Sequence, residues 1–383
     1  MKKQAIIVGL LVVILFSFSM TVSGIALLSG NRLAGSPSTN QNLLDFATAA
    51  APSVKIAPIP APAVPITPIE RIFLAGGSSI NPLNHAFRPS VNKVISSNDG
   101  VSYTQLTASA LWSPRSNHTL TSFFGLLFVM GGANPHGPGP YTEYNDVYVT
   151  IDGSNWIQWL TNAPWAPRSG HDTILLNGQL FLMGGSTWLN PNLPRTYLND
   201  VWSSPDGQNW TFLGNAPWAG RDRFASVIFN NQIFVIGGKG HPQSFADVWS
   251  SPDGINWIQH PNAPWSSFRH GHSALVFNGK IYLIGGGMVT SGFLTNDVWS
   301  SVDGTNWVQE TASAPWSTRM DHVSLVFDGY MWVIGGLDYS GTVSLYNIIY
   351  TDAWKSRDGI NWTRATTNIP NLNGDGFAGV VLP

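Results

Sequence analysis

The chain has 383 residues, and 10% of them are charged. Its formal net charge is −2, and it contains no cysteine. This composition offers no basic surface for nucleic acid, and it excludes disulfides, thiolate metal ligands and a cysteine nucleophile. Seventeen tryptophans and 39 glycines favour a turn-rich, all-β protein.

Residues 1–30 differ from the rest of the chain. Lys2 and Lys3 precede an uncharged, apolar stretch over residues 5–28, and about 20 apolar residues span a bilayer as a helix. Two interpretations stay open: a retained membrane anchor, or a secretory signal peptide cleaved near residues 22–24. Under either one, the two lysines predict that the remaining chain lies outside the cytoplasm, secreted or anchored to the membrane through residues 5–28.

Residues 31–69 are rich in proline, with six prolines from Pro52 to Pro68. This spacing favours an extended, semi-rigid, polyproline-like chain. We therefore expect a linker or stalk ahead of the domain that follows.

Residues 70–383 contain six copies of one unit. Each copy has two apolar runs joined by a tight turn, Gly-Gly at the end of the second run, a loop of variable length, an Asp-Val-Trp-like run, an Asp-Gly turn and an Asn-Trp-like run. The pattern predicts four short strands per copy. The Gly-Gly pairs begin at Gly76, Gly131, Gly184, Gly237, Gly285 and Gly335, and the Asp-Gly turns begin at Asp99, Asp152, Asp206, Asp253, Asp303 and Asp358.

The two ends of the repeat region complement each other. The region begins with the second apolar run of a copy, Arg71 to Gly77, and no first run precedes it. It ends with residues 376–382, which resemble the first apolar run of the other copies. We expect the last strand to complete the first sheet and so to remove its exposed edge. The chain is therefore predicted to be all-β, a six-bladed β-propeller.

These residues resemble kelch repeats, including those of the galactose oxidase central domain. The resemblance covers residues 70–383 and is carried by the Gly-Gly pairs, a later tryptophan pair such as Trp249 and Trp257, and the start Pro167-Arg168 with His171. It implies the propeller fold, but kelch propellers include binding modules, scaffolds and a few enzymes. Galactose oxidase needs copper and a tyrosine linked to a cysteine, which this chain lacks, so we expect no metal and no cofactor.

The Asp-Gly turns also resemble the Asp-box of sialidases, although they are one residue shorter between Asp and Trp. A retaining sialidase needs a nucleophile and a carboxylic acid of raised pKa. Of the 21 acids, six sit in the Asp-Gly turns and five in Asp-Val-Trp-type positions, and this repetition predicts that they are structural. No sequence pattern pairs the remaining ones, so sialidase is the weaker enzyme hypothesis.

The variable loops are predicted to gather on one face of the propeller, because antiparallel strands send alternate connections to opposite faces. Variable loops on a rigid scaffold are the usual place for binding. Ligand-binding candidates on this face are Tyr141, Tyr144, Trp188, Arg195, Tyr197, His85, Arg88 and His136.

Arginines also recur at the start of the first strand in five of the six copies, and two interpretations of them stay open. They could form an anion-binding ring at the channel mouth, or each could pair with the aspartate that opens the third strand, about two strand spacings away. In the first copy Lys93 and Asp375 would form a reversed pair. The five arginines are Arg115, Arg168, Arg221, Arg269 and Arg319.

We interpret the chain as an exported or membrane-anchored propeller that binds a glycan or a protein through its variable-loop face. The alternative is an enzyme acting on a sugar acid, similar to the sialic-acid epimerases that resemble kelch propellers. A purely structural surface protein is the third hypothesis. An enzyme should show polar residues in the channel that break the sixfold pattern.

Overall fold

The computed structural model describes residues 70–80, 87–88, 90–135, 141–188, 194–241, 244–265, 269–288, 294–338, 348–372 and 376–382. The predicted membrane or signal segment (1–30) and the proline-rich linker (31–69) lie outside these residues. Within the described part of the chain, no helix combines the length and apolarity needed to cross a membrane.

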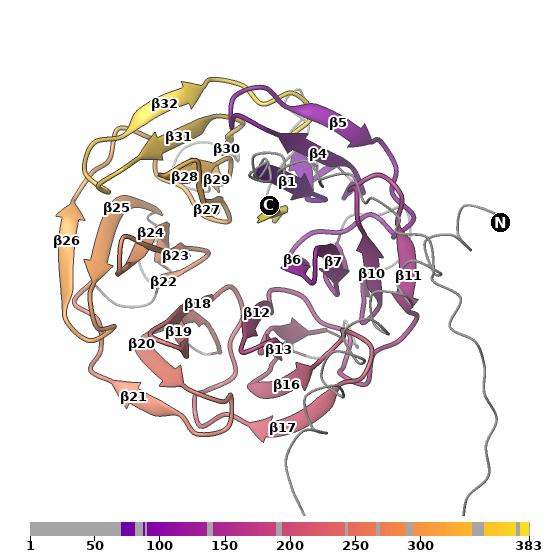
Figure 1. Ribbon diagram of the computed structural model, residues 1–383. Coiled ribbons are helices and arrows are strands. Elements are labelled where there is room, and N and C mark those ends of the chain that lie inside the picture. The colour runs from indigo at the N-terminus through magenta and orange to yellow at the C-terminus, as the bar shows by residue number, and fades with distance from the viewer. Residues whose placement is uncertain are drawn as a thin grey trace, which may run out of the picture. The chain divides into compact units, whose positions relative to one another are not determined.

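Six sheets, which we call blades 1 to 6, are arranged around a central axis (Figure 1). This confirms the predicted all-β, six-bladed propeller. Each blade has four main strands, which we name in order from the axis outward. Blade 1 has β33 (Ala378–Leu382), β1 (Arg71–Ala75), β4 (Val94–Ser97) and β5 (Thr104–Thr107); blade 2 has β6 (Thr119–Phe123), β7 (Leu126–Met130), β10 (Val147–Thr150) and β11 (Ile157–Leu160); blade 3 has β12 (Asp172–Leu176), β13 (Gln179–Met183), β16 (Asp200–Ser204) and β17 (Thr211–Asn215).

The other three blades repeat this order. Blade 5 also contains β22 (Arg269–His270), which pairs with the end of β24. Blade 4 has β18 (Ala225–Phe229), β19 (Gln232–Lys239), β20 (Ser244–Ser251) and β21 (Ile258–His260); blade 5 has β23 (Ser273–Phe277), β24 (Lys280–Met288), β25 (Leu294–Ser301) and β26 (Trp307–Thr311); blade 6 has β27 (Val323–Phe327), β28 (Tyr330–Ile334), β31 (Ala353–Ser356) and β32 (Thr363–Thr366).

The ring closes as predicted. β33 pairs antiparallel with β1 over its whole length, from Arg71 opposite Leu382 to Ala75 opposite Ala378. The C-terminal strand thereby covers the inner edge of β1, which would otherwise present unpaired backbone groups.

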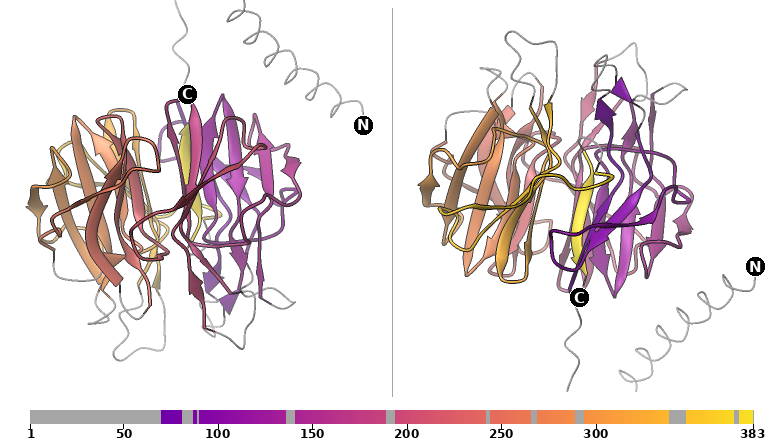
Figure 2. Two further views of the ribbon diagram at one scale, coloured as in Figure 1. Left: turned by 90° about the horizontal axis from the view of Figure 1, so that it is seen from below. Right: turned by 90° about the horizontal axis from the view of Figure 1, so that it is seen from above.

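Four small hairpins extend the connections between second and third strands, and they project from one face of the propeller, which we call the loop face (Figure 2). They are β2 (Ser79–Ile80) with β3 (Phe87–Arg88), β8 (Ala133–Asn134) with β9 (Thr142–Glu143), β14 (Ser186–Thr187) with β15 (Thr196–Tyr197), and β29 (Leu337–Asp338) with β30 (Ile348–Ile349).

The core lies between neighbouring blades. In five of the six crossovers a tryptophan is buried and meets, edge to face, a tryptophan near the fourth strand of the next blade, as with Trp112 and Trp156 at 5.9 Å between ring centroids. Large buried aromatics contribute strongly to packing, so this pair seals the contact between blades. The other pairs are Trp165 with Trp210, Trp218 with Trp257, Trp265 with Trp307, and Trp316 with Trp362.

The Asp-Gly turns are structural, as expected from their repetition. Asp303 Oδ1 accepts the backbone N–H groups of Thr305 and Asn306, and its Oδ2 accepts the side-chain amide of Asn306. These bonds lower the pKa of Asp303 to about 2, and the bond from the Asn306 backbone N–H has the largest effect. A carboxylate that accepts these hydrogen bonds fixes the turn in its charged form.

A circuit of backbone hydrogen bonds surrounds the axis at the loop face. One residue just before each innermost strand has a positive φ. Five hydrogen bonds, of 2.7 to 2.9 Å, each join the backbone N–H of one of these residues to the backbone carbonyl of the corresponding residue in the adjacent blade. The circuit holds the starts of the inner strands together. Its members are Asn117, Gly170, Arg223, Gly271, Asp321 and Gly376.

Candidate functional site

The repeated arginines are internal to the blades. Arg221, for example, has a side chain with 0% exposure, and its two terminal nitrogens donate to the two oxygens of Asp247 at 2.7 and 2.8 Å. Its Nη1 also donates to the carbonyl of Gly237. The predicted pairing is therefore confirmed in the five copies, which are Arg115 with Asp146, Arg168 with Asp200, Arg221 with Asp247, Arg269 with Asp297, and Arg319 with Asp352.

These arginines present no open surface to an anion, because the exposure of each side chain is 0 to 2%. The geometry thus favours the structural interpretation over an anion-binding ring. The reversed pair of Lys93 with Asp375 cannot be placed, since Asp375 lies outside the described residues.

Tyr144 belongs with this framework. The Arg115 guanidinium carbon lies 4.2 Å from the centroid of the Tyr144 ring. Phe245 and Tyr350 cover Arg221 and Arg319 in the same way, at 4.4 Å. Although Tyr144 lies in a variable loop, its ring covers a repeated arginine and does not join the other loop aromatics.

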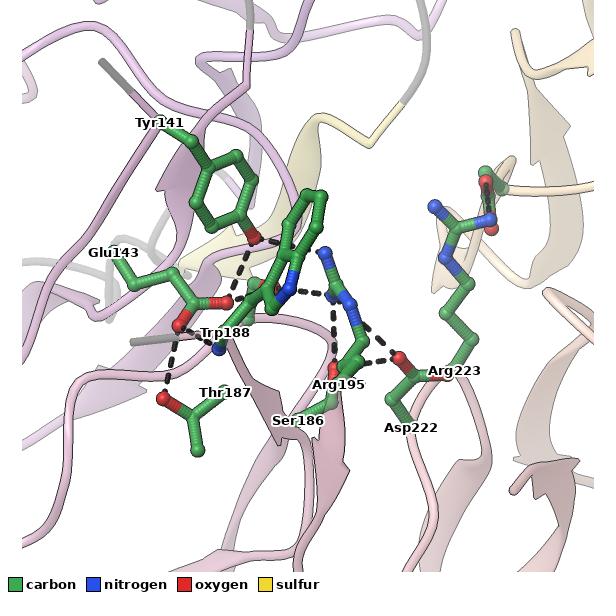
Figure 3. Close-up of polar contacts among 10 residues, drawn as sticks. Tyr141, Glu143, Ser186, Thr187, Trp188, Arg195, Asp222 and Arg223 are labelled. Carbon is green, nitrogen blue, oxygen red and sulfur yellow. Dashed lines mark hydrogen bonds and ion pairs between the residues drawn. The ribbon is translucent and has the colours of Figure 1, made fainter. Parts of the chain in front are cut away.

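Three of the predicted binding residues do come together on the loop face. Tyr141 from blade 2 and Trp188 and Arg195 from blade 3 lie side by side (Figure 3), with the Tyr141 and Trp188 ring centroids 5.3 Å apart. The Arg195 guanidinium carbon lies 5.7 Å from the Tyr141 ring and 5.8 Å from the Trp188 ring. We call these residues, with Glu143, Ser169, Ser186, Thr187 and Asp222, the Arg195 cluster.

Arg195 is held by hydrogen bonds but is not enclosed. Nη1 donates to Ser186 Oγ at 2.9 Å and Nη2 donates to Tyr141 Oη at 2.9 Å. Nη1 also lies 3.9 Å from Asp222 Oδ2, and 30% of the side chain is exposed. A guanidinium has five N–H donors, so Arg195 keeps donors for a ligand while its orientation is fixed.

Glu143 ties the loops of two blades together. Its carboxylate accepts bonds from Tyr141 Oη at 2.7 Å, Thr187 Oγ1 at 3.0 Å and the backbone N–H of Trp188 at 2.7 Å, with Ser169 Oγ at 3.4 Å. Because it accepts hydrogen bonds from the Tyr141 hydroxyl and the Trp188 backbone N–H, Glu143 positions both residues. In the sequence Glu143 is only an unpaired acid in an irregular loop, so its role was missed.

Asp222 is the second acid that the sequence did not select. It is 5% exposed, and its Oδ2 accepts a bond from Ser186 Oγ at 2.6 Å. Its Oδ1 has no hydrogen-bond partner among the described residues. Burial raises the pKa of Asp222, although Arg223, Ser186 and Arg195 act in the opposite direction. The available signal was a carboxylate at a repeat position that holds Ser, Ser, His or Met in four of the other copies and a second aspartate, Asp375, in the copy that closes the ring.

Beside the cluster, a cavity of about 240 Å³ occupies the axis. Its lining includes Asn117, Asp172, Arg223 and Asp321, and Arg223 Nη1 lies 3.2 Å from Asp321 Oδ2. Asp172 Oδ2 accepts the backbone N–H and the hydroxyl of Ser226 in the next blade. Polar residues that break the sixfold pattern therefore do occur along the channel.

The recurring histidines that line this cavity are buried. Burial lowers the pKa of His118, His272 and His322 to about 3, with a nearby arginine acting in the same direction. These imidazoles are neutral at physiological pH. In the described part of the chain, no three His, Asp or Glu side chains group so as to hold a metal ion.

The other four predicted binding residues are Tyr197, Arg88, His85 and His136, and the structure describes two of them. Tyr197 is half-buried on β15 opposite Ser186, and burial raises the pKa of its hydroxyl. Arg88 is described in its backbone alone, on β3 opposite Ser79. His85 and His136 lie outside the described residues.

Known proteins similar to this chain include a kelch-repeat family and a group of sugar epimerases. A model described as the KLHDC2/KLHL20/DRC7 Kelch-repeats domain matches residues 117–336, more than half of the chain. N-acetylneuraminate epimerases of Escherichia coli K12 and Shigella flexneri are 25% and 24% identical in an alignment of 162 residues, and the match covers 34% of this chain. The match covers 43% of the length of those relatives.

Among solved structures, YjhT has the same fold. Its TM-score is 0.58 at 17% sequence identity, over 76% of this chain and 97% of that chain. This agreement extends over nearly the whole of YjhT and is a likeness of architecture.

Proposed function

This chain belongs to the KLHDC2/KLHL20/DRC7 kelch-repeat family, and from that premise we propose that it binds an acidic sugar of the sialic-acid class at the Arg195 cluster. The named relatives that act on N-acetylneuraminate support this ligand class. The cluster supplies matching chemistry, a cation beside two aromatic rings on the loop face.

The observation that carries the proposal is the state of Arg195. Its guanidinium is oriented by Ser186 and Tyr141, and 30% of its side chain remains exposed. A guanidinium fork suits a planar carboxylate. The adjacent Trp188 and Tyr141 rings offer the apolar surface that small-molecule sites combine with a few placed polar groups.

The test is a titration of the full-length chain with N-acetylneuraminate, followed by calorimetry or ligand-observed NMR. We expect binding that Arg195→Lys weakens at least about tenfold, because lysine keeps the charge but loses the fork. The matched control is Arg364→Lys, a change at an exposed arginine on the outer strand β32. Absence of binding to the wild-type chain, or equal losses in the two variants, would contradict the proposal.

A second candidate is an enzyme that interconverts epimers of such a sugar, and Asp222 favours it. Its carboxyl group lies 3.9 Å from the guanidinium of Arg195, and burial raises its pKa. A carboxyl group of raised pKa beside a bound hemiketal can donate and accept the protons that ring opening requires. A substoichiometric amount of chain should then accelerate exchange between the epimers, measured by NMR, and Asp222→Asn should abolish the acceleration while binding persists.

We also propose that residues 5–28 place the propeller outside the cytoplasm, as the apolar stretch after Lys2 and Lys3 supports. If the stretch is a retained anchor, the full-length chain should stay with membranes through high-salt washing. Recovery of a mature chain that begins after residue 24 would identify a cleaved signal instead. Accumulation in the cytoplasm would contradict both forms of the proposal.

A further inference from the structure

Part of the wall of the axial cavity is formed by polar side chains of blades 2 and 3. Its wall includes Thr119 and Thr121 on β6, and Asp172 and Thr173 on β12. The corresponding wall of β33 is formed by Ala378 and Gly379. The hydroxyl groups of the lining therefore come from blades 2 and 3, the two blades that also carry Tyr141, Trp188 and Arg195, while Asp321 adds a carboxyl group from the start of blade 6.

One hydroxyl of this wall has no partner. Thr119 is 8% exposed, and its Oγ1 makes no hydrogen bond to any residue that the structure describes. A buried polar atom left unpaired is unfavourable, and a hydroxyl can both donate and accept. In addition, β6 and β12 are the inner edges of their sheets, so backbone groups of these strands also face the axis.

The cavity and the Arg195 cluster share a rim. Ser169 and Asp222 belong to the cluster, and the residues that follow them, Gly170 and Arg223, line the cavity. The Arg223 N–H donates to the Gly170 carbonyl at 2.9 Å. A Cβ atom on Gly170 would lie 3.0 Å from the Asp222 Cβ. The cavity therefore opens next to the groups that orient Arg195.

We infer that the cavity receives the polyhydroxyl side chain of the acidic sugar whose carboxylate Arg195 holds. The inference rests on the proposed function and deepens it, because it distinguishes between classes of acidic sugar. Sialic acids carry a glycerol-like side chain on the ring, whereas hexuronic acids do not. Hydroxyl groups of such a chain can pair with Thr119 and with the backbone groups of the inner strands.

The test compares two ligands on the full-length chain. One is N-acetylneuraminate, and the other is its derivative shortened by two carbons in the side chain through mild periodate oxidation and borohydride reduction. By calorimetry, we expect the shortened ligand to bind at least about tenfold more weakly. This comparison uses wild-type protein and does not depend on the folding of any variant.

A variant then assigns the difference to the cavity. Thr119→Val replaces the hydroxyl by a methyl group of similar size, and it should weaken binding of N-acetylneuraminate by about fivefold while leaving the shortened ligand unchanged. Thr211→Val, an exposed threonine on the outer strand β17, is the matched control and should change neither.

The outcomes separate the two ideas. If neither ligand binds, the proposed function fails. If both ligands bind with equal affinity, the inference about the cavity is overturned and the proposed function stands. If the shortened ligand binds more weakly but Thr119→Val acts equally on both ligands, the side chain is recognised elsewhere, and the inference is again overturned.

Discussion

Arg221 and Arg195 show two uses of the same side chain. Arg221 is completely buried, and both of its terminal nitrogens donate to Asp247 of its own blade. Arg195 is 30% exposed and is oriented by Tyr141 and Ser186, which belong to different blades. A charge with a complete set of partners stabilises the framework, whereas one with donors to spare is available to a ligand.

The largest expected effect concerns the closure of the framework. Deleting residues 378–382 removes β33 and leaves the inner edge of β1 unpaired. We expect loss of the cooperative thermal transition or aggregation, because an apolar strand edge becomes exposed. Circular dichroism melting and light scattering measure this. A truncated chain that melts within a few degrees of the full-length chain would show that closure does not hold the ring together.

The next effect separates the two arginines directly. Arg221→Ala leaves Asp247 without its bidentate partner, and breaking a well-buried pair costs about 3–5 kcal/mol of unfolding free energy. The affinity of the folded variant for N-acetylneuraminate should be unchanged. Arg195→Ala should do the reverse, with loss of binding and a stability change below about 1 kcal/mol. Denaturant unfolding and calorimetry on both variants test the contrast, which fails if Arg221→Ala abolishes binding in a fully stable protein.

A smaller effect concerns Asp172, an acid on the inner strand of blade 3. Burial raises its pKa to about 6, although its bonds with Ser226 and Thr173 act in the opposite direction. Since the folded pKa exceeds the unfolded value of 3.8, its contribution to stability is present below about pH 4 and is lost as the pH rises through 6.

Asp172→Asn removes this ionisation and keeps an oxygen that can accept from Ser226. We expect the variant to be more stable than wild type at pH 7.5, by up to about 3 kcal/mol. Its unfolding free energy should also vary less between pH 4 and 6. Denaturant titrations at several pH values give both quantities. An unchanged pH profile would mean that Asp172 titrates normally.

The smallest effect compares two tyrosines of one loop. Tyr141→Phe removes the hydroxyl that links Arg195 to Glu143 and should weaken ligand binding roughly two- to tenfold, as for one hydrogen bond. Tyr144→Phe keeps the ring that covers Arg115 and should change neither affinity nor melting temperature. Equal affinities for the two variants would remove Tyr141 from the site.

The framework was predictable because its contacts recur. The Arg–Asp pairs follow from two residues that recur in five of the six copies, at strand positions about two spacings apart. Tyr144 shows that the same reasoning could have gone further. It precedes Asp146 by two residues, as Phe245 and Tyr350 precede their aspartates, so its role in covering an arginine was visible in the repeat.

The Arg195 cluster was predictable only in part. Tyr141, Trp188 and Arg195 were selected because they lie on adjacent long loops, and the structure does bring them together. Glu143 and Asp222 were not selected, since no spacing in the chain pairs either of them with Arg195. Asp222 reaches the cluster from the start of blade 4, and its proximity depends on how three blades are placed around the axis.

By itself, the sequence determined the number of blades, the pairing of the last strand with the first and the partners of the repeated charges. It could do so because each copy places the same residues in the same local environment, and periodicity makes that environment readable. Only the tertiary structure decided which loop residues meet, which oxygen of Asp222 has no hydrogen-bond partner among the described residues, and where the axial cavity opens. Those features arise where loops of unrelated sequence from different blades converge, and their contacts depend on the positions of side chains that no repeat encodes.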